Sequence, residues 1–258
     1  MARSTAGESV LERVVRILQV FDTENVAVSV TDIAERADLP MSTASRLIDD
    51  MVELGLLRRD QNRRVRIGFR LWELASRAGP TRGLRDAAMP FIEDLHAIVG
   101  HHVQVGVLDG REVLFIERLS SPGAVINVTR IAGRLSLHAS SSGLVLLAYS
   151  SSAFQEQILR GPLPAYTSQT LTEPSELRAF LAEVRRSGAA VCPGFIHPDA
   201  TGIAVPIRDR RDAVVATLSV VVPRTERPSV HLPALMAAAR GIRREIGRPN
   251  FDVPGSTN

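Results

Sequence analysis

Lysine is absent from this chain of 258 residues, so all 31 of its basic residues are arginine. Arginine codons are mostly GC-rich, so a GC-rich genome would account for this preference without any functional cause. The formal net charge is only +3 and says little about partners. The local distribution of charge is more informative than the total.

Cysteine is nearly absent as well. The single Cys192 excludes an internal disulfide framework and zinc sites built from several cysteines. No apolar run approaches the roughly 20 residues that a membrane helix needs, and the N-terminal MARSTAGESV lacks the apolar stretch of a secretory signal. We therefore expect a cytoplasmic globular protein, whose 45% hydrophobic residues suffice for a sizeable core.

The first 78 residues carry the pattern of three helices followed by a hairpin. Ser9 with Glu12 forms a capping-box signature, and Ser29 with Asp32 repeats it. Apolar residues then recur at helical spacing. The expected elements are helices opening at Ser9 and at Ser29, a helix over 41–54, strands over 56–59 and 64–67, and a connecting helix over 71–75. Trp72 in the connecting helix is a candidate packing anchor, either within the chain or at a dimer contact.

Positive charge gathers on the expected hairpin. Residues 58–70 hold six arginines against one acid, Asp60. Such density favours contact with a polyanion. A winged helix-turn-helix has the same order of elements: a helix, a short helix, a turn, another helix and a basic hairpin. The helix after the turn is the one that enters the major groove of DNA.

We therefore predict a DNA interface made of one helix start and the hairpin. The predicted contacts are Ser42, Thr43, Ser45, Arg46, Arg63, Arg64 and Arg66. Hydroxyl groups can bond phosphates or bases, and an arginine can bond guanine through two hydrogen bonds. The competing interpretation is a three-helix protein-interaction module with a solvated arginine hairpin. The charge of the hairpin favours DNA.

Residues 79–248 are predicted to form a second domain of the α+β class with a mainly antiparallel sheet. A Gly/Pro-containing break at 77–83 marks the boundary, and residues 249–258 form a polar tail that we expect to be disordered. The expected strands cover 102–108, 112–119, 125–129, 203–207 and 214–222, and the expected helices cover 84–99, 142–150, 175–187 and 232–246.

Both parts resemble the IclR family of bacterial transcriptional regulators. The family's helix-turn-helix motif corresponds to residues 38–48, with Met41 in place of the usual lysine. In the second part, residues 133–140 resemble its "leu-his-ala" turn and residues 188–223 its late signature. The resemblance covers about residues 9–246. It implies a winged helix-turn-helix domain and a GAF/PAS-like domain that binds a small effector over the sheet.

The resemblance also implies where the effector binds. Backbone amides after the "leu-his-ala" strand would hold a carboxylate, and a helix N-terminus suits an anion. The implied residues are Leu137, Ser140, Ser141, Ser142, Gly143, Cys192, Gly202, Ser219 and Val221. The alternative is that one serine only caps the helix. Val105 and Val107 are further candidates for the lining.

The sequence departs from the family at three positions in and beside this set. The family often has acids where Cys192 and Phe195 stand, and a cysteine or serine where Gly202 stands. Leu144 also replaces a usual lysine. Loss of these polar groups suggests an effector more apolar or bulkier than a two-carbon oxo-acid.

The expected function is a ligand-responsive regulator of a catabolic or metabolic operon, answering to a small organic acid or aromatic compound. We predict a homodimer or homotetramer on a pseudo-palindromic DNA operator, with no membrane partner. No catalytic residue, cofactor or metal is predicted, and His101, His102 and His138 are not expected to be metal ligands. An enzyme using Cys192 and the serine loop, and a module that only oligomerises, are the competing hypotheses.

Overall fold

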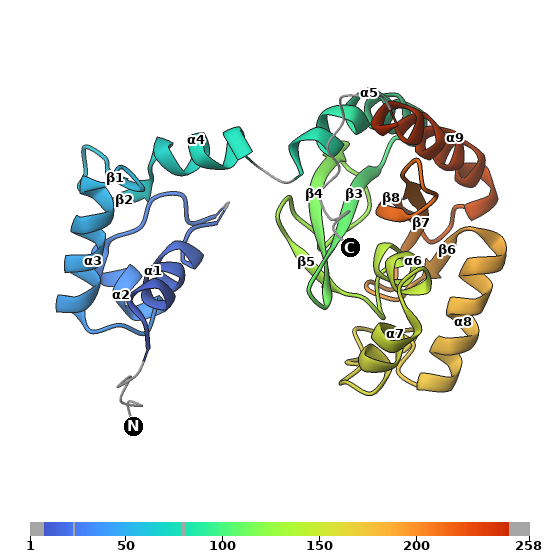
Figure 1. Cartoon of the computed structure of the whole chain (residues 1–258), viewed down its shortest axis with the longest axis horizontal. Coiled ribbons are helices and arrows are strands. Elements are labelled where there is room, and N and C mark those ends of the chain that lie inside the picture. The colour runs from blue at the N-terminus through green and yellow to red at the C-terminus, as the bar shows by residue number, and fades with distance from the viewer. Residues whose placement is uncertain (1–7, 23, 79–80, 248–258) are drawn as a thin grey trace. The chain divides into compact units, whose positions relative to one another are not determined.

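Two units make up the chain, residues 1–79 and residues 80–258 (Figure 1). The computed structural model describes residues 8–22, 24–78 and 81–247. The predicted disordered tail, 249–258, lies outside the described residues. No helix in the described ranges has both the length and the apolar character that crossing a membrane requires.

The first unit contains four helices and a short hairpin within its described residues. They are α1 (Val10–Gln19), α2 (Val30–Arg36), α3 (Met41–Glu53), β1 (Leu57–Arg59), β2 (Val65–Ile67) and α4 (Phe69–Ala78). The predicted capping box is confirmed: Glu12 N donates to Ser9 Oγ at 3.1 Å, and Ser9 N donates to Glu12 Oε2 at 2.7 Å. Apolar residues of the helices, among them Ile17, Ile33 and Ile48, pack with Leu57 and Val65 of the hairpin to form the core.

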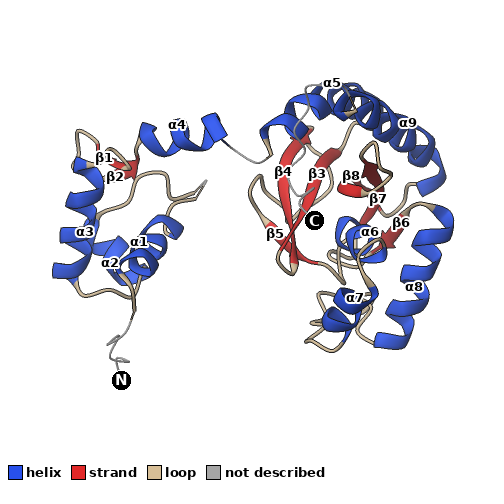
Figure 2. Ribbon diagram, in the orientation of Figure 1, coloured by secondary structure: helices blue, strands red, loops and turns tan. Residues whose placement is uncertain are grey.

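The second unit is built on one antiparallel sheet in the order β5-β4-β3-β8-β7-β6 (Figure 2). The strands are β3 (His102–Asp109), β4 (Glu112–Ser120), β5 (Arg134–Ser136), β6 (Ala190–Pro193), β7 (Ala200–Arg208) and β8 (Val214–Pro223). The helices are α5 (Arg82–Val99), α6 (Ser141–Ala148), α7 (Ser152–Leu159), α8 (Pro174–Ser187) and α9 (Pro228–Ile246). The predicted α+β class with a mainly antiparallel sheet is confirmed.

Each face of the sheet has its own hydrophobic core. Helices α5 and α9 pack on one face, against residues such as Val103, Val105 and Val220. Helices α6 and α8 pack on the other face, where Phe115 and Leu144 are buried. Because successive side chains of a strand point to opposite faces, this three-layer arrangement buries nearly the whole length of β3, β7 and β8.

The strand predicted over residues 125–129 is wrong. The segment 121–133, which joins β4 to β5, contains no strand. The outer edge of β4 is already paired with β5, from Glu112–Ser136 to Leu114–Arg134. Alternating residues predicted a strand, but the segment forms no ladder with β4. Side chains of β3 and β4 bind its backbone carbonyls instead. The sequence pattern assigned no bounds to strands β5 and β6 and did not predict helix α7, although the family resemblance implies a strand before the "leu-his-ala" turn.

Trp72 does not anchor a core. Its side chain is 68% exposed on α4, next to Phe69 at 70%. Trp72 is therefore no anchor for the core of its own unit, and its role as a packing anchor at a dimer contact stays a prediction.

Candidate functional site

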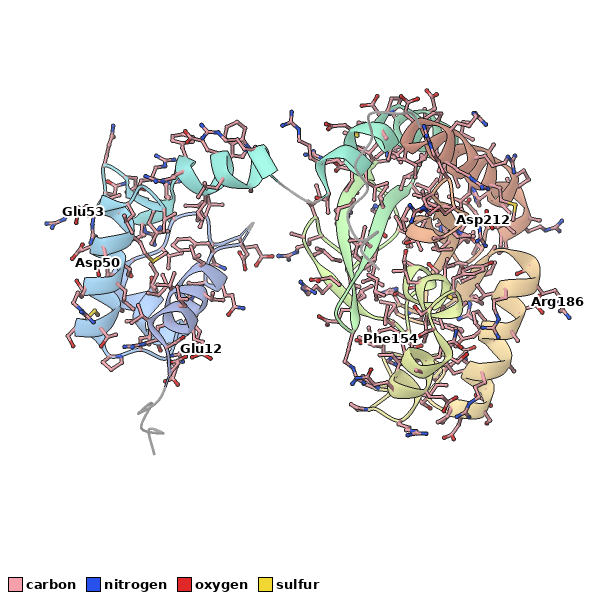
Figure 3. All side chains as sticks on the ribbon, viewed as in Figure 1. Glu12, Asp50, Glu53, Phe154, Arg186 and Asp212 are labelled. Carbon is pink, nitrogen blue, oxygen red and sulfur yellow. The ribbon has the colours of Figure 1, made fainter. Side chains whose placement is uncertain are left out.

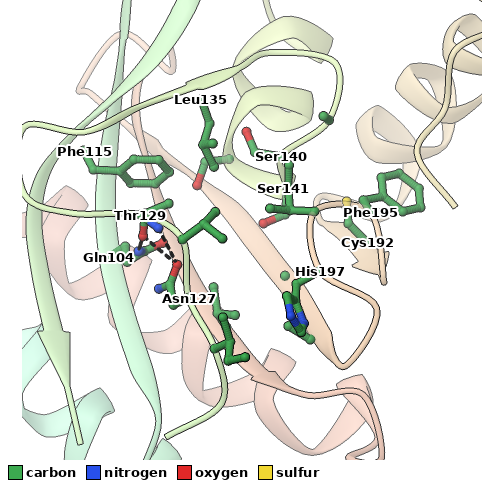
Figure 4. A pocket seen from close by; sticks show the side chains of 18 residues that line it. Gln104, Phe115, Asn127, Thr129, Leu135, Ser140, Ser141, Cys192, Phe195 and His197 are labelled. Carbon is green, nitrogen blue, oxygen red and sulfur yellow. Dashed lines mark hydrogen bonds between the residues drawn. The ribbon is translucent and has the colours of Figure 1, made fainter. Parts of the chain in front are cut away.

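A cavity opens on the α6 side of the sheet and encloses about 480 Å³ of empty space, its mouth included (Figure 4). Its walls come from all six strands of the sheet, the start of α6, the residues after β6 and the 121–133 segment. The apolar lining consists of Phe115, Ile126, Val128, Leu135, Ala139, Cys192, Phe195, Ile196, Ala200 and Val221. The polar lining is Gln104, Asn127, Thr129, Ser140, Ser141, Ser142 and His197, with Gly202 at the floor.

The N-terminus of α6 lies at this cavity, and the serines at this helix end make different contacts. Ser140 caps the helix, because its Oγ accepts a hydrogen bond from Gly143 N at 3.1 Å. Ser142 is 1% exposed, and its Oγ has no hydrogen-bond partner among the described residues. Helix capping therefore accounts for Ser140 but leaves the Ser142 hydroxyl unexplained.

Gly202 lets Ser141 approach the sheet. A Cβ on Gly202 would lie 2.8 Å from Ser141 Oγ, closer than real contacts allow. On the neighbouring strand, Cys192 is 3% exposed and pairs with Gly202. Burial raises the pKa of the Cys192 thiol well above its ordinary value, so the nucleophilic thiolate is absent near neutral pH.

Three further predicted effector residues, Leu137, Gly143 and Ser219, do not line the cavity. Leu137 is buried in the core beside α6, where its backbone touches Gly143. Ser219 lies in the middle of β8, opposite Gln104, and its buried Oγ has no partner within the described ranges. Val105 and Val107 pack toward α5 and α9, so their expected place in the lining is wrong. They share one face of β3, and Gln104 lies on the other.

The 121–133 segment is tied to the sheet by side chains. His102 is 4% exposed, and its Nε2 donates to Val125 O at 2.6 Å while its Nδ1 meets Ser120 Oγ at 2.9 Å. Gln104 Nε2 donates to Thr129 Oγ1, and Arg118 Nη1 donates to Thr129 O. Burial lowers the pKa of His102, which favours the neutral ring.

Sequence reasoning missed Gln104, Asn127, Thr129 and His197. A polar residue at an inward position of a strand, as at Gln104, is the signal that could have been used. Asn127 and Thr129 lie where the predicted strand over 125–129 does not form, and His197 lies outside regular strands, so strand periodicity did not assign these side chains to the cavity.

The predicted DNA-contacting residues of α3 sit at its first two turns. Ser42 and Arg46 are exposed, whereas Thr43 and Ser45 are half-buried. Pro40 precedes the helix, and no side chain caps it. Further along α3, Asp50 and Glu53 point to solvent (Figure 3).

The basic hairpin is partly neutralised by nearby acids. Arg59 Nη2 lies 2.6 Å from Asp49 Oδ1, and Arg66 Nε lies 3.0 Å from Asp60 Oδ2. Arg66 holds the pKa of Asp60 below its ordinary value. Arg63 and Arg64, at the turn, are exposed and have no ionic partner in the described part of the chain.

The histidines singled out in the sequence are engaged in other contacts. His101 Nε2 lies 3.0 Å from Glu226 Oε1, and His138 Nε2 donates to Pro164 O at 3.0 Å. Among the described residues, no group of three or more potential ligands is arranged to hold a metal ion.

Comparison with known proteins identifies both units. Residues 10–61 match the family model "IclR helix-turn-helix domain", and residues 80–248 match "Bacterial transcriptional regulator IclR C-terminal". The chain belongs to the IclR family. The resemblance stated from the sequence is confirmed, and the family is one of transcriptional regulators, which excludes the enzyme hypothesis.

Similar proteins in the IclR family cover nearly the whole chain. A crystal structure of an IclR homolog from Microbacterium hydrocarbonoxydans, complexed with 4-hydroxybenzoate, is 46% identical over 92% of this chain and 99% of that one, with a TM-score of 0.88. The regulator XynR of Escherichia coli is 27% identical over 93% of this chain and 97% of its own length. The Pca regulon regulatory protein of Pseudomonas putida is 27% identical over 92% and 83%, respectively.

Proposed function

We propose that this IclR-family chain is a ligand-responsive regulator that controls a catabolic or metabolic operon in answer to a small aromatic or other organic acid. The cavity beside α6 carries the proposal. It combines apolar walls with a helix N-terminus and a buried, unpartnered hydroxyl on Ser142. An apolar body with one carboxylate is the ligand chemistry that such a site favours.

In the proposed complex, the carboxylate accepts hydrogen bonds from Ser142 Oγ and from backbone N–H groups at the start of α6. The first N–H groups of a helix have no partner within it, and the helix dipole favours negative charge there. Ser140 and Ser141 flank this point. Cys192, Gly202 and Val221 line the sheet side of the cavity, and Leu137, Gly143 and Ser219 support the site from outside the cavity.

The character of the walls favours an aromatic acid over a two-carbon oxo-acid. Cys192 and Phe195, which stand where relatives often have acids, are both buried in the lining. Phe195 also stacks near Phe180, with ring centroids 5.8 Å apart. The complex of the Microbacterium hydrocarbonoxydans relative with 4-hydroxybenzoate supports this class of ligand.

On the DNA side, the start of α3 would enter the major groove, with Arg46 at the base edges. Ser42, Thr43 and Ser45 would contact bases or phosphates, and Arg63, Arg64 and Arg66 the backbone or minor groove. The exposed apolar side chains of α4, Phe69, Trp72 and Leu74, support a homodimer or higher oligomer on a pseudo-palindromic operator.

Titration calorimetry of the full chain with benzoate and 4-hydroxybenzoate tests the effector site. Ser142→Ala should weaken binding of both acids by about tenfold or more, because a hydrogen bond to a charged group is worth about 1.5–3 kcal/mol. Ser150→Ala is the matched control, since its hydroxyl caps a carbonyl at the far end of α6. Failure of every small organic acid to bind the wild-type chain would contradict the proposal.

Fluorescence anisotropy with the DNA upstream of the chain's own gene tests the proposed operator binding. The wild-type protein should prefer this DNA over a shuffled sequence of the same length. Arg46→Ala should cost roughly 1–3 kcal/mol of specific binding if Arg46 contacts a base. Arg186→Ala, an exposed arginine on α8 (Figure 3), is the control. Equal affinity for both DNAs would overturn the proposed operator binding.

A further inference from the structure

The cavity contains a second buried polar atom without a partner. Asn127 Nδ2 lies on the 121–133 segment, on a different wall from α6, and has no hydrogen-bond partner among the described residues (Figure 4). Buried polar groups in native proteins are nearly always paired, so an unpaired one on a residue that lines a binding cavity points to a group on the ligand. The proposed carboxylate site uses Ser142 and leaves Asn127 unused.

The orientation of the Asn127 amide follows from its neighbour Thr129. Asn127 Oδ1 lies 3.0 Å from Thr129 N and 2.7 Å from Thr129 Oγ1. A backbone N–H can only donate, so the Asn127 atom that faces it is the acceptor oxygen and the other is the amide nitrogen. Both lone pairs of Oδ1 are then occupied. What remains for a ligand is the donor, Nδ2.

The neighbours of Asn127 hold it in place. Thr129 Oγ1 donates to Asn127 and accepts from Gln104 Nε2, while Thr129 O accepts from Arg118. Gln104 is 1% and Thr129 4% exposed, so this chain of bonds is shielded from water. A donor that is already oriented costs little ordering on binding and gives selectivity for its partner.

We infer that Asn127 is a specificity-determining residue that donates a hydrogen bond to an acceptor oxygen on the effector, at the wall away from the carboxylate. This rests on the proposed function of the cavity. The effector class is thereby narrowed to an acid with a second oxygen acceptor, such as a ring hydroxyl. A methyl group at the same place leaves the donor unpaired, and a site built around a hydrogen bond rejects such an analogue strongly.

The test compares hydroxybenzoates with methylbenzoates substituted at the same ring position, at positions 2, 3 and 4. The two members of a pair have the same number of heavy atoms and differ in the acceptor oxygen. Titration calorimetry on the full wild-type chain should show at least one pair in which the hydroxy compound binds tenfold or more tightly than the methyl compound.

Two variants assign that preference to Asn127. Asn127→Ala enlarges the cavity and Asn127→Leu nearly conserves its volume, but both remove the donor. In each variant, the ratio of the two dissociation constants within that pair should fall to about threefold or less. Partial loosening of the 121–133 segment does not change this ratio, because it weakens the binding of both compounds alike. Thermal unfolding of each variant checks its fold.

The outcomes separate this inference from the proposed function. Ser142→Ala should weaken the binding of both members of the pair and leave the ratio of their dissociation constants unchanged. If the wild-type chain binds benzoates but shows no tenfold pair, or if both Asn127 variants keep the ratio, the inference is overturned while the effector site stands. If no benzoate or other organic acid binds, the proposed function fails, and the inference with it.

Discussion

At the scale of single residues, Gly143 decides how closely α6 approaches the turn before it. A Cβ at this position would lie 2.5 Å from Leu137 O and 2.6 Å from Leu137 Cα. Backbone atoms cannot rotate away, so Gly143→Ala should lower the free energy of unfolding by about 1–3 kcal/mol, the usual cost of overpacking. Urea denaturation measures this change.

Gly202→Ala is the matched control for Gly143→Ala. Its added methyl meets the Ser141 hydroxyl, which can rotate, so a smaller loss of stability is expected. The same methyl narrows the cavity floor. If Gly143→Ala were as stable as the wild-type chain, close approach of α6 would not be what requires glycine at this position.

His102 makes the stability of the second unit depend on pH. Burial lowers the pKa of His102 in the folded chain below the ordinary value of 6.5. The unfolded chain therefore binds more protons just below pH 6.5, and the stability contributed above that pH is lost as the pH falls toward the folded pKa. The free energy of unfolding should decrease between pH 7.5 and 5.5.

Two comparisons assign part of this decrease to His102. His102→Gln should lose less stability over the same range, although His138, whose pKa burial also lowers, still contributes. Urea titrations of both proteins at the two pH values measure the difference. Equal pH dependence in the variant and the wild-type chain would rule out His102 as a source. The electrostatic effect of the neighbours Arg118, His101 and His96 lowers the pKa of His102 in the same direction as burial.

At the scale of elements, the β1–β2 hairpin separates free from neutralised arginines. Arg63 and Arg64 are exposed at its turn, whereas Arg66 is paired with Asp60 at 3.0 Å. Each phosphate contact releases counterions, so Arg63→Ala and Arg64→Ala should each reduce the slope of log affinity against log salt by about one. Arg66→Ala should reduce it less. Anisotropy titrations at several salt concentrations check this, and an unchanged slope in the first two variants would remove the turn from the interface.

The elements also show what sequence patterns can and cannot determine. Helices with clear caps, such as α1 at Ser9 and α8 ending at Gly188, begin and end within a residue or two of expectation. Alternation located β3, β4, β7 and β8. It failed at residues 125–129, because alternation reports burial on one side and says nothing about whether a partner strand is available. There, side chains of β3 and β4 bind the backbone instead.

The same distinction applies to the site. Ser140, Ser141, Ser142, Cys192, Gly202 and Val221 were named because a family motif fixes their place, and all of them line the cavity. Asn127 and Thr129 belong to no motif. Their position depends on how the 121–133 segment lies against β3, a tertiary contact that a single sequence does not encode locally.

At the scale of the whole molecule, the two proposed sites lie in separate units of one chain. Arg46→Ala should lower operator affinity without changing the dissociation constant of a hydroxybenzoate. Ser142→Ala should raise the hydroxybenzoate concentration needed for half of the response and leave operator affinity unchanged when no ligand is present. Each variant thus serves as the control for the other.

Regulation requires more than two independent sites, because a ligand changes DNA binding only through a different affinity for two states of the protein. If the hydroxybenzoate changes operator affinity by some factor, saturating operator must change hydroxybenzoate affinity by the same factor, typically 5- to 150-fold for coupled sites. Calorimetry with and without operator DNA, and anisotropy with and without ligand, measure the two factors independently. A factor of one in both experiments would mean that the acid and the operator bind independently. That result would contradict the proposal that the chain is a ligand-responsive regulator.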